Sequence, residues 1–317
     1  MNVLPIIIDC DPGIDDAIAL LSAFVAPGLD IRGICAVCGN QPLEKTVRNA
    51  LQIVELGQRT DIPVFAGCHR PLLRTPIHGQ FHGESGLGKT VLPAPQKQPE
   101  SRHAVNFIIE QCRQAAADGQ PMTICTLGPL TNVAMALRMV PDIADGIARI
   151  VMMGGAYREA GNRSLTSEFN MLADPQAAKV VFDSSIAIVA LPLDVTHQVI
   201  LTPELVARFI AVSGRIAAPL GEMMAFWDRN DIRRYGSRGG PLHDPLVIAW
   251  VLAPQYFTTE KASVYIEQES ELCMGQTVAD WYGKTERQPN VDVVTGVDAE
   301  WVVELFVDLL SRYGEGS

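Results

Sequence analysis

The chain has 317 residues, of which 48% are hydrophobic and 19% charged, a composition that supports a large core and excludes intrinsic disorder. Its net charge of −11 argues against a nucleic-acid surface, which needs a basic stripe, and suits a site for a metal cation. The apolar run Val3–Ile8 is too short for a signal-peptide core, and no later run is long enough to span a bilayer. Seven scattered cysteines suggest no disulfide framework, so we expect a cytoplasmic protein with reduced thiols and no membrane partner.

Short apolar runs alternate with helical patterns over the first two thirds of the chain. The runs typical of buried strands are Val3–Ile8, Ile31–Val37, Met122–Leu127, Ile150–Met153 and Ile186–Leu191. The helical patterns between them are Asp16–Val25, Leu43–Leu56, Ala104–Ala117, Thr131–Met139 and Pro175–Phe182. This alternation predicts an α/β fold with a Rossmann-like core, in which an open, mostly parallel sheet carries helices on both faces.

Two stretches fit neither helix nor strand. Cys68–Pro99 is rich in proline and glycine, and Asp228–Leu242 is rich in arginine and glycine. Long irregular segments in a compact enzyme are usually functional, so both are candidate covers of a site. Strand-like segments and a last helix, Glu300–Ser311, follow Ala262 without a Ser/Gly linker, so we expect one domain over residues 1–317.

The strongest chemical feature is a group of four aspartates in the segment Asp9–Asp16, which directly follows the first predicted strand and opens the first helix. Ligands of open parallel sheets bind at the carboxyl ends of strands. Carboxylates this close repel one another unless a cation lies among them, and hard divalent cations bind carboxylate oxygens. Capping the helix would need one or two acids, so four favour a metal site.

Two known arrangements of aspartates bear on this segment. An EF-hand loop counted from Asp9 would need Gly and Glu where the chain has Ile14 and Leu20, so that motif is excluded. A phosphatase or phosphotransferase that uses Asp9 as nucleophile also places Asp-x-Asp after its first strand. The phosphatase or phosphotransferase stays open as an alternative, although such enzymes have Thr or Val two residues after the second Asp, where this chain has Gly13.

The segment Asp9–Ala17 also resembles the opening motif of the inosine-uridine nucleoside hydrolase family. Further blocks similar to that family follow in its order: Gly39-Asn40, His82-Gly83, Leu127–Asn132, Met153–Gly155, Gly161-Asn162, Glu168–Asn170, Asp174-Pro175 and His243–Pro245. A set of this length is far more specific than any single motif.

The resemblance implies an enzyme that uses water and Ca²⁺ to hydrolyse the N-glycosidic bond of purine or pyrimidine ribonucleosides. The implied metal ligands are Asp11, Asp16, Asp244 and the carbonyl of Leu127. Asp11 would also be the general base for the attacking water, and His243 the acid or hydrogen-bond donor to the leaving base. The implied substrate contacts are Asp15, Asn40, His82, Asn162, Glu168, Phe169, Asn170 and Tyr235. The family also implies a small-molecule substrate and a homodimer or homotetramer.

Residues 83–90 match the P-loop pattern G-x-x-x-x-G-K-[ST], but no buried strand precedes them and a proline-rich segment follows. We interpret the match as accidental and expect no ATP or GTP binding there. Besides the hydrolase, two other functions remain open at this point. One is a phosphotransferase built on Asp9 and Asp11, and the other is a non-catalytic, Ca²⁺-dependent nucleoside-binding protein.

Overall fold

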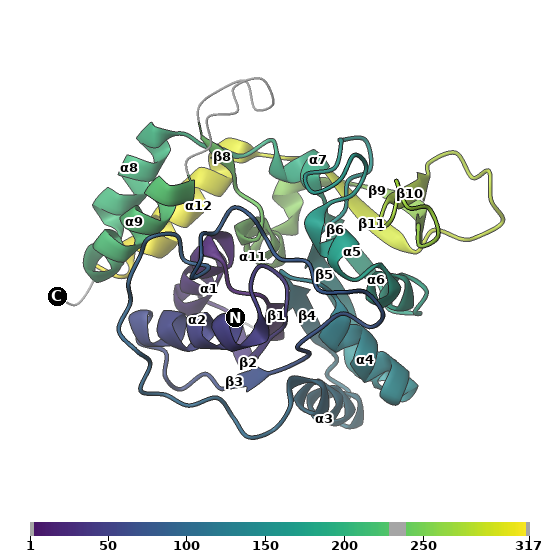
Figure 1. Ribbon diagram of the computed structural model, residues 1–317, viewed down its shortest axis with the longest axis horizontal. Coiled ribbons are helices and arrows are strands. Elements are labelled where there is room, and N and C mark those ends of the chain that lie inside the picture. Colours follow the sequence, from purple (N-terminus) through teal and green to yellow (C-terminus); the bar gives the residue numbers. More distant parts are fainter. Residues whose placement is uncertain (1–2, 228–238, 315–317) are drawn as a thin grey trace.

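The computed structural model describes residues 3–227 and 239–314, and its central feature is a nine-stranded sheet (Figure 1). The order across the sheet is β10-β9-β11-β6-β5-β4-β1-β2-β3. These strands are β1 (Leu4–Cys10), β2 (Leu29–Ala36), β3 (Val64–Ala66), β4 (Met122–Thr126), β5 (Ile147–Met153), β6 (Ile188–Leu191), β9 (Phe257–Ile266), β10 (Thr277–Asp280) and β11 (Val291–Val297).

The sheet is parallel from β3 through β11, and only β9 and β10 add antiparallel pairs at one edge. Side chains of β1 alternate between the faces: Ile6 and Ile8 belong to one hydrophobic cluster, and Ile7 belongs to the other. The fold class predicted from the sequence, an α/β fold with a mostly parallel sheet and helices on both faces, is confirmed.

Each face of the sheet is covered by its own group of helices. The longer helices with buried residues in the first cluster are α1 (Ile14–Val25), α2 (Leu43–Leu56), α8 (Pro203–Val212), α9 (Ala217–Trp227), α11 (Pro245–Leu252) and α12 (Ala299–Ser311). Those with buried residues in the second are α3 (Ala104–Ala117), α4 (Thr131–Met139), the 3-10 helix η1 (Pro141–Gly146) and α6 (Pro175–Phe182). The remaining short elements are α5 (Phe169–Ala173), α7 (Leu193–Thr196), η2 (Gly214–Ile216), η3 (Pro254–Tyr256) and a two-stranded antiparallel sheet of β7 (Ile200–Leu201) and β8 (Gly240–Pro241).

The predicted elements differ from the observed ones mainly at their ends. The three-residue strand β3 was not predicted, because it is too short to show a pattern and gains its order by pairing with β2. Cys68–Pro99 contains no helix or strand, as expected. Within Asp228–Leu242, residues 228–238 lie outside the described part, and the expectation of no strand is wrong at Gly240–Pro241, where pairing with β7 orders the chain. In the described part of the chain, no helix combines the length and apolar character that a membrane crossing needs.

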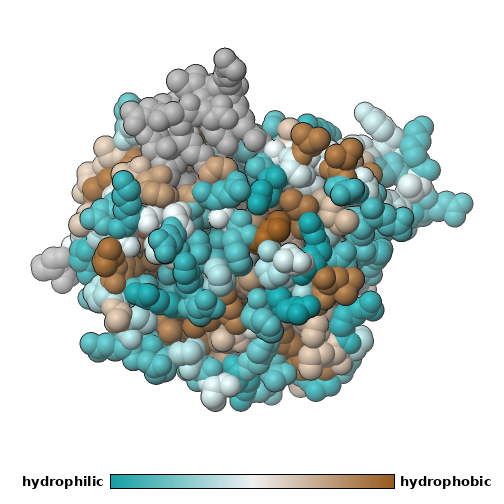
Figure 2. Space-filling model, viewed as in Figure 1, coloured by the Kyte–Doolittle hydropathy of each residue, from teal (hydrophilic) through white to brown (hydrophobic). Residues whose placement is uncertain are grey.

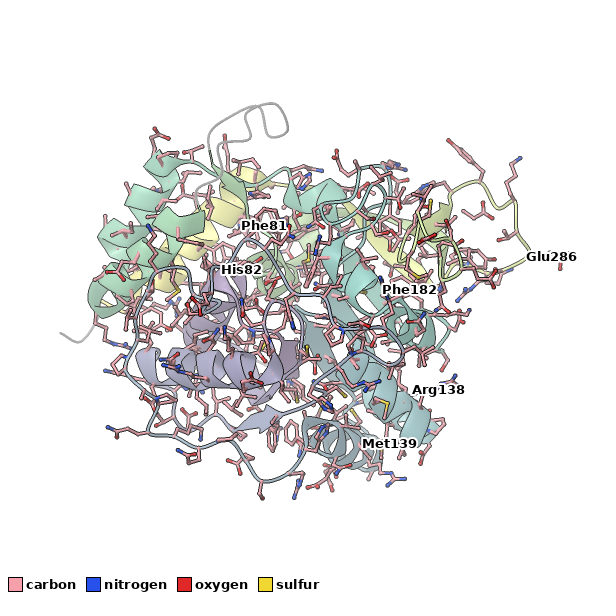
Figure 3. All side chains as sticks on the ribbon, in the orientation of Figure 1. Phe81, His82, Arg138, Met139, Phe182 and Glu286 are labelled. Atoms are coloured by element: carbon pink, nitrogen blue, oxygen red, sulfur yellow. The ribbon has the colours of Figure 1, made fainter. Side chains whose placement is uncertain are left out.

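The chain reverses its direction of travel across the sheet at β1. Strand β2 pairs with one side of β1, and β4 pairs with the other. The loops that leave the carboxyl ends of β1 and β4 therefore separate toward opposite sides, which leaves a crevice between them. Figure 2 shows a mostly hydrophilic face in this view, with apolar residues in small groups. Phe81 and His82 lie together near the centre of the same view (Figure 3).

Candidate functional site

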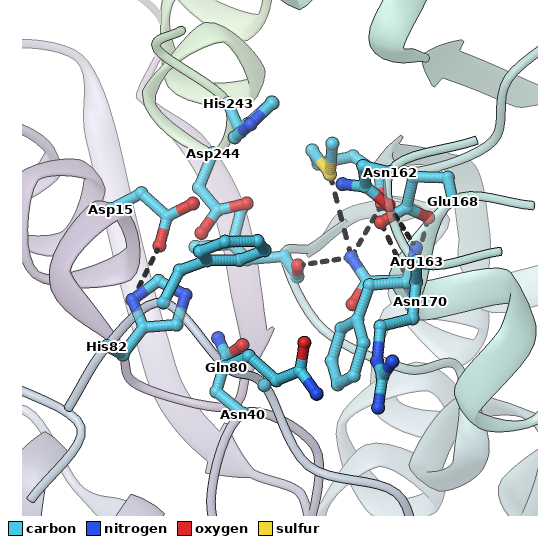
Figure 4. Close-up of a pocket in the computed structure, with 15 residues that line it drawn as sticks. Asp15, Asn40, Gln80, His82, Asn162, Arg163, Glu168, Asn170, His243 and Asp244 are labelled. Atoms are coloured by element: carbon cyan, nitrogen blue, oxygen red, sulfur yellow. Dashed lines mark hydrogen bonds and ion pairs between the residues drawn. The ribbon is translucent and has the colours of Figure 1, made fainter. Parts of the chain in front are cut away.

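A pocket opens at this crevice (Figure 4). Segments that follow β1, β2, β4 and β5 contribute to it, together with residues 79–82 and the two residues before α11. The sequence-predicted residues that line it are Asp15, Asn40, His82, Leu127, Asn162, Glu168, Phe169, Asn170, His243 and Asp244. Tyr235 lies outside the described residues.

Three buried carboxylates converge at one end of the pocket. Oxygen atoms of Asp15, Asp16 and Asp244 lie within 4.8 Å of one another. The first two stand in the first turn of α1, and the third directly precedes α11, which packs against α1. Burial, reinforced by the charge of Asp15, raises the pKa of Asp16 to about 7. Burial and the charges of the neighbouring aspartates raise the pKa of Asp244 well above its usual range.

Asp11 lies beside this cluster in the turn between β1 and α1, where it is 1% exposed. Its Oδ2 accepts a hydrogen bond of 2.5 Å from the backbone N–H of Asn40. Gly39 and Gly128 press against the carboxylate so closely that a side chain at either position would collide with its oxygens. Burial, and next the charge of Asp16, raises the pKa of Asp11. The turns after β2 and β4 thus hold this carboxylate in one place.

The donor set of the aspartate cluster fits a hard divalent cation. The Oδ1 atoms of Asp11, Asp15 and Asp16 are buried and have no hydrogen-bond partner among the described residues. Buried oxygens are normally paired, and unpaired carboxylates are costly unless a cation compensates them. The cluster contains only oxygen ligands in the described part of the chain, which suits Ca²⁺ or Mg²⁺ rather than a softer metal.

A polar network forms the opposite wall of the pocket. Glu168 caps α5 and accepts hydrogen bonds from the backbone N–H groups of Gly155 (3.1 Å) and Asn170 (2.9 Å). Asn170 Nδ2 donates to the carbonyl oxygen of Leu127 over 2.8 Å, and Asn162 Oδ1 accepts from the N–H of residue 169 over 2.9 Å. Burial raises the pKa of Glu168 to about 7 despite these bonds. The wall presents carboxylate and amide groups suited to binding hydroxyls.

Two buried histidines line the pocket, and their contacts differ. His82 Nδ1 accepts the backbone N–H of Ile14 over 3.1 Å, so this nitrogen carries no proton and the ring N–H is at Nε2. Nδ1 also lies 3.8 Å from Asp15, but a nitrogen that accepts an N–H does not form a charged pair there. His243 Nδ1 lies 2.8 Å from Thr196 Oγ1 in α7, which fixes the ring beside the carboxylate of the next residue.

Asp9, the fourth aspartate of the opening segment, does not line the pocket. It is fully buried, and its Oδ2 accepts a hydrogen bond of 2.8 Å from Asn132 Nδ2. Burial raises the pKa of Asp9 to about 8. A nucleophile must reach a substrate atom, so this geometry gives no support to a phosphotransferase that uses Asp9.

The segment that matches the P-loop pattern is neither preceded by a strand nor followed by a helix. Side chains of α2 hold it through its carbonyl oxygens: Asn49 donates to Ser85, and Lys45 donates to Glu84. The backbone N–H of Gly88 donates to the carbonyl oxygen of His82 over 2.8 Å. A phosphate site needs free N–H groups at a helix N-terminus. The absence of nucleotide binding at this segment stays a prediction.

Sequence reasoning missed part of the pocket lining. The additional residues are Gly79, Gln80, Phe81, Met153 and Arg163. Phe81 and Arg163 adjoin predicted site residues and Met153 belongs to a motif that carried the resemblance, so sequence position was the available signal for these three, whereas Gly79 and Gln80 had none. None of these side chains has a fixed role in a recognised motif, and only the fold shows that they face the pocket.

Three comparisons describe what the chain is similar to. Residues 6–304 match the family model described as inosine-uridine preferring nucleoside hydrolase. The pyrimidine-specific ribonucleoside hydrolase RihA of Salmonella gallinarum is 43% identical over 312 residues, which cover 98% of this chain and 99% of that protein. A plant nucleoside hydrolase structure matches with a TM-score of 0.89 and 29% identity, over 97% of this chain and 99% of the other. The structure of a purine-preferring ribonucleoside hydrolase from Gardnerella vaginalis also matches with a TM-score of 0.89 and 29% identity, over 99% of this chain and 100% of the other.

Proposed function

Because the chain belongs to the inosine-uridine preferring nucleoside hydrolase family and is a ribonucleoside hydrolase acting on N-glycosyl bonds, we propose that it depends on Ca²⁺ and prefers pyrimidine ribonucleosides. The observations that carry the metal part of the proposal are the buried, unpaired Oδ1 atoms of Asp11 and Asp16 and the approach of oxygens of Asp16 and Asp244 to within 4.8 Å. Asp11, Asp16, Asp244 and the carbonyl of Leu127 would hold the cation. When bound, Ca²⁺ would polarise the attacking water and bind ribose hydroxyls.

The residues around the pocket have separate roles in proton transfer, ribose binding and departure of the base. Asp11 accepts a proton from the attacking water, and its fixed position between two glycine turns supports this role. Asp15, Asn40, Asn162, Glu168 and Asn170 bind the ribose hydroxyls, Phe169 and His82 border the ribose and base, and Tyr235 is a further candidate base contact. The carboxylates also stabilise the positive charge that develops on the ribose ring. His243 donates a hydrogen bond or proton to the leaving base.

The pyrimidine preference rests on similarity. The relative named as pyrimidine-specific is 43% identical, whereas the structure named as purine-preferring is 29% identical, and both align over nearly the whole chain. We further propose one domain and a homodimer or homotetramer, which the resemblance supports and light scattering would test.

A reducing-sugar assay with uridine, cytidine, inosine and adenosine tests the proposal. We expect ribose release that is fastest with the two pyrimidine nucleosides. Chelation should abolish turnover and added Ca²⁺ should restore it, and metal analysis should find one Ca²⁺ per chain. Binding without turnover would point instead to a nucleoside-binding protein, and zinc or no divalent ion in the purified protein would contradict the metal assignment.

A further inference from the structure

Arg163 is the one arginine or lysine among the described residues that line the pocket. Its Nε is buried and has no hydrogen-bond partner within the described part of the chain. No ion pair between described residues includes Arg163. The nearby Arg158, in contrast, forms an ion pair of 2.9 Å with Glu260 at the surface. A guanidinium has five donors and no acceptor, so Arg163 is suited to an oxygen atom supplied by the ligand.

The depth of the surrounding groups shows which part of a nucleoside would reach Arg163. Figure 4 places it on the wall of Glu168 and Asn170, across the pocket from Asp15 and His82. The polar groups suited to ribose lie deep, since Glu168 is 2% and Asn170 4% exposed. Phe81, at 43% exposed, belongs to the outer lining, which suits a flat base. Arg163 is half-buried, between these two levels.

We propose that Arg163 donates hydrogen bonds to an exocyclic carbonyl oxygen of the pyrimidine base and stabilises the negative charge that the base acquires as it leaves. This inference rests on the proposed hydrolysis of pyrimidine ribonucleosides and adds a leaving-group residue to it. Its permanent charge means that Arg163 acts electrostatically and transfers no proton.

The step balances without any further reactant. Water oxygen forms a bond to C1′ of the ribose and gives one proton to the carboxylate of Asp11. The C1′–N1 bond breaks, and its electron pair moves onto the base, where it is shared between N1 and the carbonyl oxygens that face Arg163. The base anion then takes one proton from His243, and the proton held by Asp11 returns through solvent to His243, so the products are ribose and neutral uracil.

The test uses a series of uridines that differ in how readily the base leaves: 5-fluorouridine, uridine and 5-methyluridine. Arg163→Ala should lower kcat and kcat/KM for uridine together by about 10- to 100-fold, the range for losing a hydrogen bond to a charged group. The loss should be smallest with 5-fluorouridine, whose base carries negative charge most easily, and largest with 5-methyluridine. Arg163→Lys keeps the charge without the planar fork, so its loss should be intermediate.

The matched control is Arg158→Ala, which removes an arginine of the same segment that is paired at the surface and should leave all three rates unchanged. Ca²⁺ content and Tm are measured for every variant, and Arg163→Gln replaces Arg163→Ala if the latter fails to fold. Equal losses on all three uridines, or rates within twofold of wild type, would overturn the proposal. Wild-type cleavage of uridine 5′-monophosphate that Arg163→Ala selectively removes would assign Arg163 to a 5′-phosphate instead and would also overturn it. If the wild-type enzyme releases no ribose from uridine, the proposed function fails rather than this inference.

Discussion

Replacing Gly39 by alanine should disable the site without unfolding the protein. A β-carbon at Gly39 would lie 2.7 Å from Asp11 Cγ and closer still to Oδ2. Restoring an ordinary contact of about 3.4 Å to Cγ moves the carboxylate by at least about 0.7 Å, and Oδ2, which lies closer, has to move farther. Metal–ligand distances tolerate only about 0.2 Å, and misplacing a catalytic group by about 1 Å can lower the rate about 10²-fold. We therefore expect Gly39→Ala to lose bound Ca²⁺ and to lower kcat about 10²-fold.

Two other glycines separate this effect from general destabilisation. A β-carbon at Gly33 in β2 would meet the Phe107 ring at 2.8 Å, so Gly33→Ala should lower Tm through overpacking, which typically costs about 1–3 kcal/mol. The folded fraction should keep its Ca²⁺ and its kcat. A β-carbon at Gly296 in β11 would lie 3.5 Å from Thr258, an ordinary contact, so Gly296→Ala should change neither quantity.

Ribose release measures kcat, metal analysis gives the Ca²⁺ content, and calorimetry gives Tm. Gly128→Ala should repeat the behaviour of Gly39→Ala, because its β-carbon would lie 2.8 Å from the same Cγ atom. A Gly39→Ala enzyme with wild-type kcat and full Ca²⁺ content would refute the argument that the two turns fix Asp11.

Two further predictions concern His243 and Glu168. His243→Ala should greatly slow inosine cleavage, whose leaving base needs a proton, but barely slow p-nitrophenyl riboside, whose leaving group needs none, and equal losses would make His243 structural. Burial raises the folded-state pKa of Glu168 to about 7 from 4.5, so the unfolded chain loses this proton first and the free energy of unfolding falls between about pH 4.5 and 7. The Tm should fall over the same pH range, and in saturating Ca²⁺ Glu168→Gln should make this fall smaller. An unchanged dependence of Tm on pH would contradict the raised pKa of Glu168.

The strands and helices that bury apolar residues in regular patterns were predictable from the sequence. Helices α2, α3, α4 and α6 have the predicted bounds. The sequence did not reveal β3 or the two-stranded sheet of β7 and β8, because two or three residues contain no usable period and their order comes from a distant partner strand. The local hydrophobic pattern thus predicts the long strands and helices that form the layers of the fold. The short strands take their conformation only when they pair with a strand that is far away in the sequence.

The pocket wall shows where motif reasoning reaches its limit. Thr131 and Asn132 belong to a block that carried the resemblance, yet both act in the scaffold. Thr131 Oγ1 donates to Asp174, the residue that caps α6, and Asn132 joins the ends of β1 and β2 through Asp9 and the carbonyl oxygen of Ala36. Arg163 belongs to no motif and nevertheless lines the pocket. Membership in a motif therefore does not distinguish a residue that binds substrate from one that holds the binding residues in place.

The opening aspartates show which physical property does make this distinction. Asp9, Asp11 and Asp16 are equally buried, and burial is the largest cause of the raised pKa of each. Asp9 accepts a hydrogen bond from a neutral side-chain amide and lies away from the other carboxylates, so protonation alone removes the cost of burying its charge. Asp11 and Asp16 lie among like charges, and an oxygen of Asp16 lies within 4.8 Å of oxygens of Asp15 and Asp244. Protonating one member of such a group leaves the others buried and charged, whereas one divalent cation satisfies them together. The mutual proximity of the buried carboxylates, rather than the number of acids, is therefore what favours a metal at this end of the pocket.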